Sequence, residues 1–104
     1  MKTFRNLKFR PNKADTKCIN ATLELSDGII MSVTAGPGRY STPGGFNDES
    51  YGFFDHYPDS NEFSSFEVGI MNENLPEEEQ EWVIEGWQSR ERINLKIEEL
   101  CTEN

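Results

Sequence analysis

The chain has 104 residues and a net charge of −9, and 12% of its residues are aromatic. This length fits one domain with a small aromatic core, and no apolar run approaches the ~20 residues needed to cross a bilayer. We therefore expect residues 1–104 to form a single acidic domain that does not span a membrane. The first residues lack the apolar segment of a secretory signal, which predicts a cytoplasmic location.

Charge is distributed unevenly along the sequence. The first seventeen residues hold six bases and one acid, a net +5, whereas the remainder holds four bases and eighteen acids, a net −14. Between Arg39 and Arg90 there are twelve acids and no base. Such a field repels nucleic acid and anionic lipid and attracts basic partners. Two interpretations stay open: the acids only keep the domain soluble, or they imitate phosphates for a basic protein groove.

The first half of the chain predicts strands. Residues 3–9 suggest a first strand closed by Pro11, which has no N–H for a ladder. Residues 18–25 alternate apolar and polar side chains, the period of a half-buried strand. Asp27-Gly28 is a preferred centre for a type I′ turn, and residues 29–34 return as the partner strand. We therefore predict a β-hairpin at this turn.

Residues 35–62 form a long stretch of small, polar and aromatic residues, which predicts an extended loop. Within it, residues 36–45 lack the Gly-Lys-Ser/Thr of a phosphate-binding loop, so we interpret them as a rigid turn that exposes Arg39 and Tyr40. Beyond the loop, residues 64–71 alternate and predict a strand that pairs with the hairpin.

The end of the chain favours a helix. Pro76 followed by three glutamates is typical of a helix start, and a one-sided apolar stripe extends the predicted helix to about Leu100. On this helix Glu78, Glu81 and Glu85 would share one solvent-facing stripe. Alternation within residues 92–97 leaves a final strand open as an alternative.

The chemistry of a catalytic or metal site is sparse. His56 is the only histidine, and its acidic neighbours match neither a zinc site nor a calcium loop. Cys18 and Cys101 lie far apart without a CxxC partner, so we expect reduced thiols rather than a disulfide or zinc site. We therefore predict no cofactor, no metal and no enzymatic activity.

Two segments carry a resemblance. The run Val33-Thr34-Ala35-Gly36-Pro37-Gly38-Arg39-Tyr40-Ser41-Thr42-Pro43 and the later Phe66-Glu67-Val68-Gly69 resemble small accessory proteins of bacteriophages and prophages. The resemblance covers about a third of the chain and brings no activity or catalytic residue with it. It implies an accessory role in a bacterial host cell, such as inhibition of DNA-targeting defence machinery.

These observations predict an α+β domain, a small antiparallel sheet of three to five strands with one long C-terminal helix on one face. The expected function is a non-enzymatic inhibitor that binds a basic, nucleic-acid-handling host protein, without direct contact to nucleic acid. A phage structural or assembly protein and a small metal-dependent hydrolase are the alternatives, and whether the chain forms a homodimer stays open. The expected partner-binding residues are Asp48, Glu49, Asp55, Asp59, Glu78, Glu81, Glu85, Arg39 and Tyr40.

Overall fold

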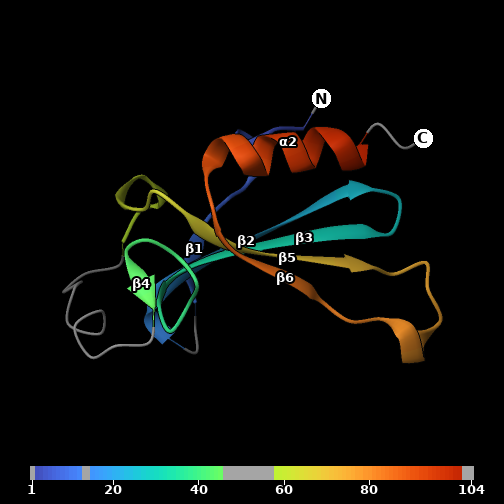
Figure 1. The fold of residues 1–104 in the computed structure, drawn as a ribbon, viewed down its shortest axis with the longest axis horizontal. Coiled ribbons are helices and arrows are strands. Elements are labelled where there is room, and N and C mark those ends of the chain that lie inside the picture. The colour runs from blue at the N-terminus through green and yellow to red at the C-terminus, as the bar shows by residue number, and fades with distance from the viewer. Residues whose placement is uncertain (1, 13–14, 46–57, 102–104) are drawn as a thin grey trace.

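A computed structural model describes residues 2–12, 15–45 and 58–101. In this part of the chain a five-strand antiparallel sheet carries one helix, α2 (Arg90–Cys101), on one face (Figure 1). The strands follow one another across the sheet as β1 (Arg10–Asn12), β2 (Asp15–Ser26), β3 (Ile29–Pro37), β5 (Phe66–Asn72) and β6 (Val83–Gln88). A two-residue strand, β4 (Gly44–Gly45), pairs in parallel with the end of β3. The predicted α+β class is confirmed.

The predicted hairpin is confirmed, but its turn is not of type I′, because Asp27 lacks the positive φ that this turn needs at both central residues. Strands β2 and β3 pair in antiparallel register, with Ala21 opposite Val33, and Gly28 at the turn has a φ of +83°. This left-handed conformation is one that glycine adopts without steric cost. As predicted, the strand that follows the loop pairs with the hairpin, because β5 lies beside β3 with Val68 opposite Val33.

The hydrophobic core lies between the sheet and α2. Ile93 and Ile97, one turn apart on the helix, are 1% and 0% exposed, and they pack with Met31, Val33 and Phe66 from the sheet. Burying each such side chain contributes about 1.5–3 kcal/mol. The alternative of a final strand over 92–97 is therefore wrong, because the two isoleucines pack at helical spacing.

The predicted first strand is placed differently. Residues Phe4–Asn6 form a 3₁₀ turn, η1, which begins with a capping box between Thr3 and Asn6. The strand β1 begins only at Arg10 and includes Pro11, which lies opposite Ile19. Proline is tolerated there because β1 is an edge strand whose outer side needs no N–H donor.

The predicted long helix is corrected over its first half. Residues Glu77–Glu79 form a single 3₁₀ turn, η3, and the following segment is strand β6, in which Val83 pairs with Ile70 and Ile84 with Gly69. Helix α2 starts only at Arg90. The physical reason is that β5 supplies a hydrogen-bonding ladder for this segment, and the β-branched Val83 and Ile84 fit a strand.

The long stretch 35–62 is partly regular. Its first residues extend β3 to Pro37, and the Arg39 N–H donates to the Gly36 carbonyl at 3.0 Å, so the predicted turn is present, although both ends of the segment 36–45 are strands. A 3₁₀ turn, η2 (Ser60–Glu62), leads toward β5. Residues 46–57 lie outside the described structure, and with them the predicted site residues Asp48, Glu49 and Asp55, as well as His56. Among the described helices, none is long and apolar enough to cross a membrane.

Candidate protein-binding surface

The face of the sheet opposite α2 carries a shallow hollow of about 200 Å³. Its floor and walls come from neighbouring strands and from the residue before β6: Ser32, Thr34, Glu67, Gly69, Trp82 and Ile84. A Cβ added to Gly69 would lie 3.0 Å from Ile84 Cδ1 and 3.1 Å from Trp82 Cε3. The missing side chain at Gly69 therefore lets Trp82 and Ile84 lie down over the sheet.

A bulge in β6 forms an aromatic corner beside this hollow. The ladder register shifts between Phe66 and Val68, and Trp87 on β6 adopts a φ of +53°. The centroid of the Trp87 ring then lies 5.0 Å from that of the Tyr40 ring, and the backbone N–H of Trp87 donates to the Tyr40 carbonyl at 2.8 Å. We call Tyr40 and Trp87 the aromatic corner.

Glu67 fastens the loop of the aromatic corner to the open face. One carboxylate oxygen accepts the Tyr40 backbone N–H at 3.0 Å, and the other accepts the Thr34 hydroxyl at 3.5 Å. Gly86 permits the close approach on the other side, since a Cβ there would lie 2.6 Å from the Tyr40 Cβ. Tyr40 is thus exposed, as predicted, and held in place, whereas the predicted exposure of Arg39 is corrected, because Arg39 is half-buried.

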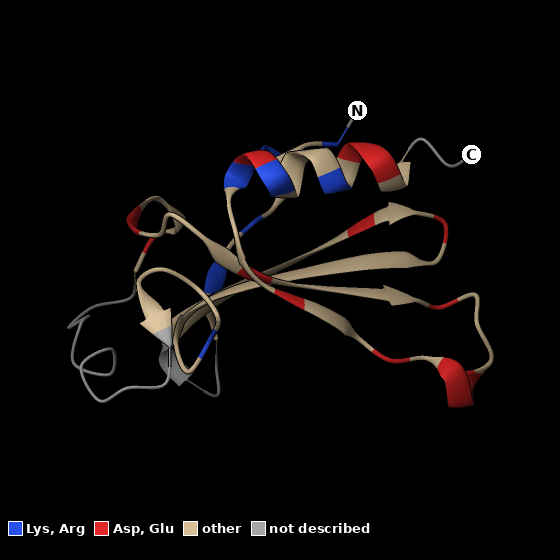
Figure 2. Cartoon of the chain, viewed as in Figure 1, with Lys and Arg blue, Asp and Glu red and all other residues tan. Residues whose placement is uncertain are grey.

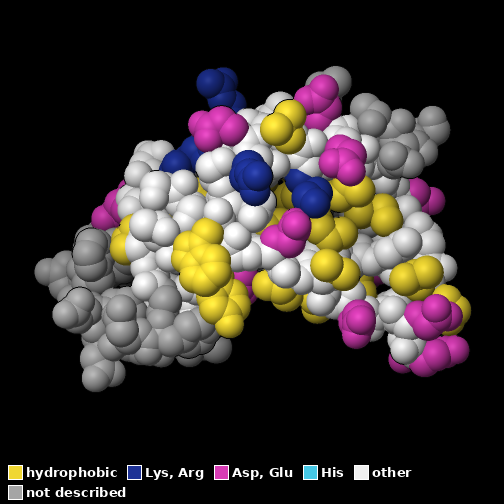
Figure 3. Space-filling view, viewed as in Figure 1, with side chains coloured by type: hydrophobic (Ala, Val, Ile, Leu, Met, Phe, Trp, Pro, Cys, Tyr) yellow, Lys and Arg dark blue, Asp and Glu magenta, His cyan; other side chains and the backbone are white. Residues whose placement is uncertain are grey.

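The β6 side of the sheet exposes apolar side chains. Val83 is 63% exposed, Ile84 50% and Trp87 58%, and Trp82 beside them is also exposed. Hydrophobic side chains gather on this side in the space-filling view (Figure 3). Because β6 ends the order of strands in the described residues, these side chains flank a bare sheet edge. Exposed apolar groups that lie together mark interaction surfaces more often than scattered ones do.

Exposed acids lie at one end of this edge. Residues 66–88 contain seven glutamates and no lysine or arginine, and five of them lie exposed in the segment 73–82 that joins β5 to β6. We call this segment the acidic connection; it forms one end of the molecule (Figure 2). Of the other two glutamates, Glu67 lies on β5, and Glu85 lies on β6 and pairs with Lys96 of α2 at 3.1 Å.

The predicted acidic stripe is therefore corrected. Glu78 belongs to η3 and Glu81 precedes β6, whereas Glu85 is engaged by Lys96 within the domain. Asp59 lies next to η2, which precedes β5, while η3 follows the other end of that strand (Figure 1). The structure thus brings Tyr40 to β6 and leaves Asp59 apart from Glu78 and Glu81.

Sequence reasoning missed the apolar β6 edge. The residues involved are Trp82, Val83, Ile84 and Trp87. Their indication was the pair of β-branched residues between two tryptophans, which favours a strand. The same residues also fit a one-sided helical stripe, and that pattern led to the prediction of a helix instead of a strand.

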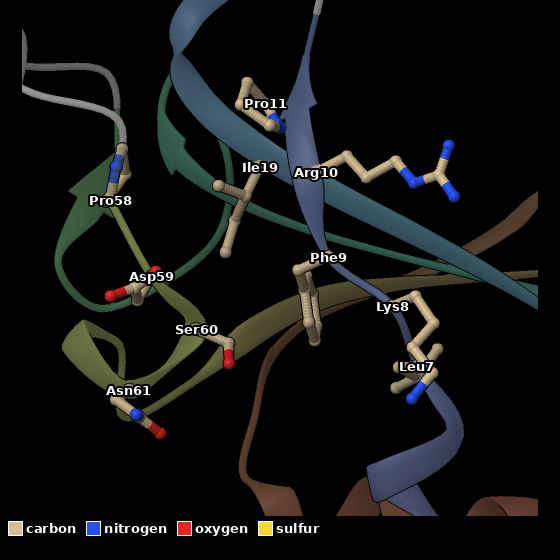
Figure 4. Close-up of a pocket in the computed structure, with 10 residues that line it drawn as sticks. All are labelled: Leu7, Lys8, Phe9, Arg10, Pro11, Ile19, Pro58, Asp59, Ser60 and Asn61. Carbon is tan, nitrogen blue, oxygen red and sulfur yellow. The ribbon is translucent and has the colours of Figure 1, made fainter.

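A second hollow, of about 530 Å³, lies between β1 and η2 (Figure 4). Phe9 and Ile19 face it, while Arg10 extends from the opposite side of its strand and Asp59 points away (Figure 4). Among its described lining residues, Arg10 and Asp59 therefore do not converge on one point. The described residues also hold no group of three metal-binding side chains.

Comparison of the chain with protein-family models, with curated proteins and with solved structures finds no match.

Proposed function

We propose that this protein is a non-enzymatic protein-binding domain that docks its β6 side onto a basic surface of a nucleic-acid-handling protein and inhibits it. One observation supports this function. Exposed tryptophan and aliphatic side chains lie on the same side of the sheet as the acidic connection, whose charged residues are all glutamates. Tryptophan and tyrosine dominate binding energy at protein interfaces. Carboxylates around them speed the encounter with a basic partner and disfavour nucleic acid itself.

The phage resemblance of Val33–Pro43 fits such a role, because an accessory protein in the host cytoplasm meets DNA-targeting defence proteins whose grooves are basic. Carboxylates of the acidic connection would occupy positions that phosphates take in those grooves. The two parts of the surface have different tasks: the acids set the association rate and its salt dependence, and the apolar side chains set the lifetime of the complex.

The test uses two variants with the same change in net charge. In the first, Glu78, Glu79 and Glu81 of the acidic connection become lysine; in the matched control, the exposed residues Glu24, Glu91 and Glu98 become lysine. Binding partners are captured from bacterial lysate, purified, and measured for association rate at low and high salt and for competition with DNA. We expect the first variant to associate at least about tenfold more slowly and the control to change little.

Two outcomes would refute this function. One is a partner that the first variant and the control bind equally fast at low salt, which would make the acidic connection merely solubilising. The other is a partner that still binds its DNA while bound to this protein, which would remove the inhibitory mechanism.

A further inference from the structure

We infer that β6 is a docking strand: an extended segment of the partner protein, with alternating apolar and basic residues, adds to the sheet as a further antiparallel or parallel strand beside β6. This inference rests on the proposed function, because it names how the partner is held on the β6 side. In the described residues β6 is the last strand of the sheet, so alternate N–H and C=O groups along it point outward.

The first half of the β6 edge lacks the usual protections against strand addition. Natural edge strands are blunted by lysine, by proline, by a β-bulge or by a covering segment, and β1, at the other edge, carries Pro11. Strand β6 has the sequence VIEGWQ, with neither residue type. Its bulge at Gly86 and Trp87 disturbs only the C-terminal end, which leaves Val83 to Glu85 as a regular template.

The exposed side chains on both faces of β6 fit the alternating side chains of an added strand. Ile84 lies on the open face with Trp82 beside Gly69, and Val83 lies on the helix side, where it is 63% exposed. Cross-strand neighbours on one face approach within about 4.5–5.5 Å, so apolar residues of the incoming segment would cover these side chains. In strand addition, main-chain hydrogen bonds give affinity and such side-chain contacts give specificity.

The charge beside β6 indicates which kind of segment would bind there. The acidic connection leads directly into β6 and carries five exposed glutamates, so an incoming strand with lysine or arginine at its polar positions meets opposite charge. A second copy of this chain would bring the same −9 charge and its own acidic connection to the contact. Like charges on paired strands are destabilising. A basic segment of another protein is thus the favoured occupant.

The first experiment uses a defined probe, a capped peptide of about eight residues that alternates lysine and valine, the length of an ordinary strand. Its partner probe has the same sequence with alternate amide nitrogens methylated, which removes the donors along one edge and keeps the charge. A third probe of equal charge contains lysine and proline only and cannot form a strand. Binding to the full chain is followed by calorimetry and by amide hydrogen exchange.

We expect the lysine–valine peptide to bind at least about tenfold more tightly than the methylated peptide, because several main-chain hydrogen bonds are lost together. Exchange should slow within residues 83–85 and stay unchanged at residues 10–12. Equal binding of all three peptides would overturn strand addition and leave the acidic surface of the proposed function standing. Binding of none of them would overturn strand addition, and the charge-reversal variants would then decide the proposed function separately.

A protein variant gives an independent check. Ile84→Lys places a blocking charge on the edge, and Thr22→Lys places the same charge on the exposed face of β2 as its matched control. Both variants should keep the wild-type circular dichroism and melting behaviour. We expect Ile84→Lys alone to weaken binding of the lysine–valine peptide by about tenfold or more. Equal loss in both variants, or a wild-type dimer in sedimentation that the peptide does not dissociate, would refute the inference.

Discussion

The aromatic corner shows how three residues determine one local conformation. A bulky residue at positive φ is strained by about 1–3 kcal/mol, and Trp87 has a φ of +53°. The strain is offset by the contact of its ring with Tyr40 and by its N–H bond to the Tyr40 carbonyl. Gly86 completes the arrangement because it leaves room for the Tyr40 Cβ. Strained residues of this kind cluster at binding sites, which agrees with the place of Trp87 on the exposed β6 side.

The close approach at Gly86 can be tested directly. In Gly86→Ala the new methyl group would lie 2.6 Å from the Tyr40 Cβ, and overpacking of this kind costs about 1–3 kcal/mol. We expect urea unfolding to show that loss and tryptophan fluorescence to report a displaced ring. In a Tyr40→Gly background the same substitution should cost clearly less. An equal cost in both backgrounds would contradict the contact.

The hairpin turn gives a second prediction at the same scale. Gly28 has a φ of +83°, and a Cβ there would lie 2.6 Å from the Asn74 side chain. Asn74 in turn donates to the Asp27 carbonyl at 2.9 Å, which ties the turn to the acidic connection. Gly28→Val should therefore lower the free energy of unfolding by more than ~1 kcal/mol. Thr22→Val, a β-branched substitution on an exposed strand position, should stay within ~0.5 kcal/mol, and similar melting of both variants would contradict the turn geometry.

At the scale of elements, the sequence predicted those strands and turns whose formation depends on residues close together in the chain. Alternation over 18–25 and the Asp27-Gly28 pair predicted the hairpin because both the strands and their turn are encoded within a few residues. The β6 segment is different: its residues fit a helical stripe as well as a strand, and its partner β5 supplies the deciding hydrogen bonds. Tertiary pairing of this kind overrides local propensity.

Of the candidate site, the sequence predicted the acidic character but not the contacts between residues far apart in the chain. Its acidic character follows from the absence of lysine and arginine between Arg39 and Arg90. The contact of Tyr40 with Trp87 joins residues far apart in sequence through a bulge, and no local pattern predicts it. Likewise, the pairing of Glu85 with Lys96 depends on how α2 packs against the sheet.

From the packing of α2 against the sheet we predict how substitutions on this helix change the stability of the domain. Ile97 is 0% exposed and Leu95, two residues earlier, is 64% exposed. Ile97→Ala should cost about 2–5 kcal/mol because it leaves a cavity under the helix, whereas Leu95→Ala should change stability by less than ~0.5 kcal/mol. Chemical unfolding followed by circular dichroism measures both. A large effect at Leu95 would mean that this residue is covered in solution.

Across the whole molecule, charge is separated by position. The exposed bases Lys2, Lys8 and Arg10 lie in or near β1, and the exposed glutamates of the acidic connection lie beside β6 (Figure 2). These two strands are opposite edges of one sheet. Five of the nineteen acids thus lie together in a segment that contains no lysine or arginine.

This separation predicts how salt acts on stability. Repulsion within the acidic connection is screened as ionic strength rises, since the Debye length falls from about 30 Å at 0.01 M to about 8 Å at 0.15 M. We expect the melting temperature to rise over this range. Neutralising Glu77, Glu78 and Glu79 to glutamine should reduce the rise, and neutralising Glu24, Glu91 and Glu98 should reduce it less. A melting temperature that falls with salt would show that attractive ion pairs dominate.

Proline at one edge of the sheet has a consequence for the stoichiometry of binding. Strand β1 contains Pro11, and the neighbouring outer part of β2 receives a hydrogen bond from Lys2 to the Glu24 carbonyl. The β1 edge therefore offers fewer free main-chain groups than the β6 edge, so the docking inference predicts strand addition at β6 rather than at β1. A head-to-tail filament needs two complementary open edges, so we expect copies of this chain not to polymerise through the sheet. Complexes with a partner that docks on β6 should then stay discrete and one to one, which sedimentation over a range of concentrations would measure.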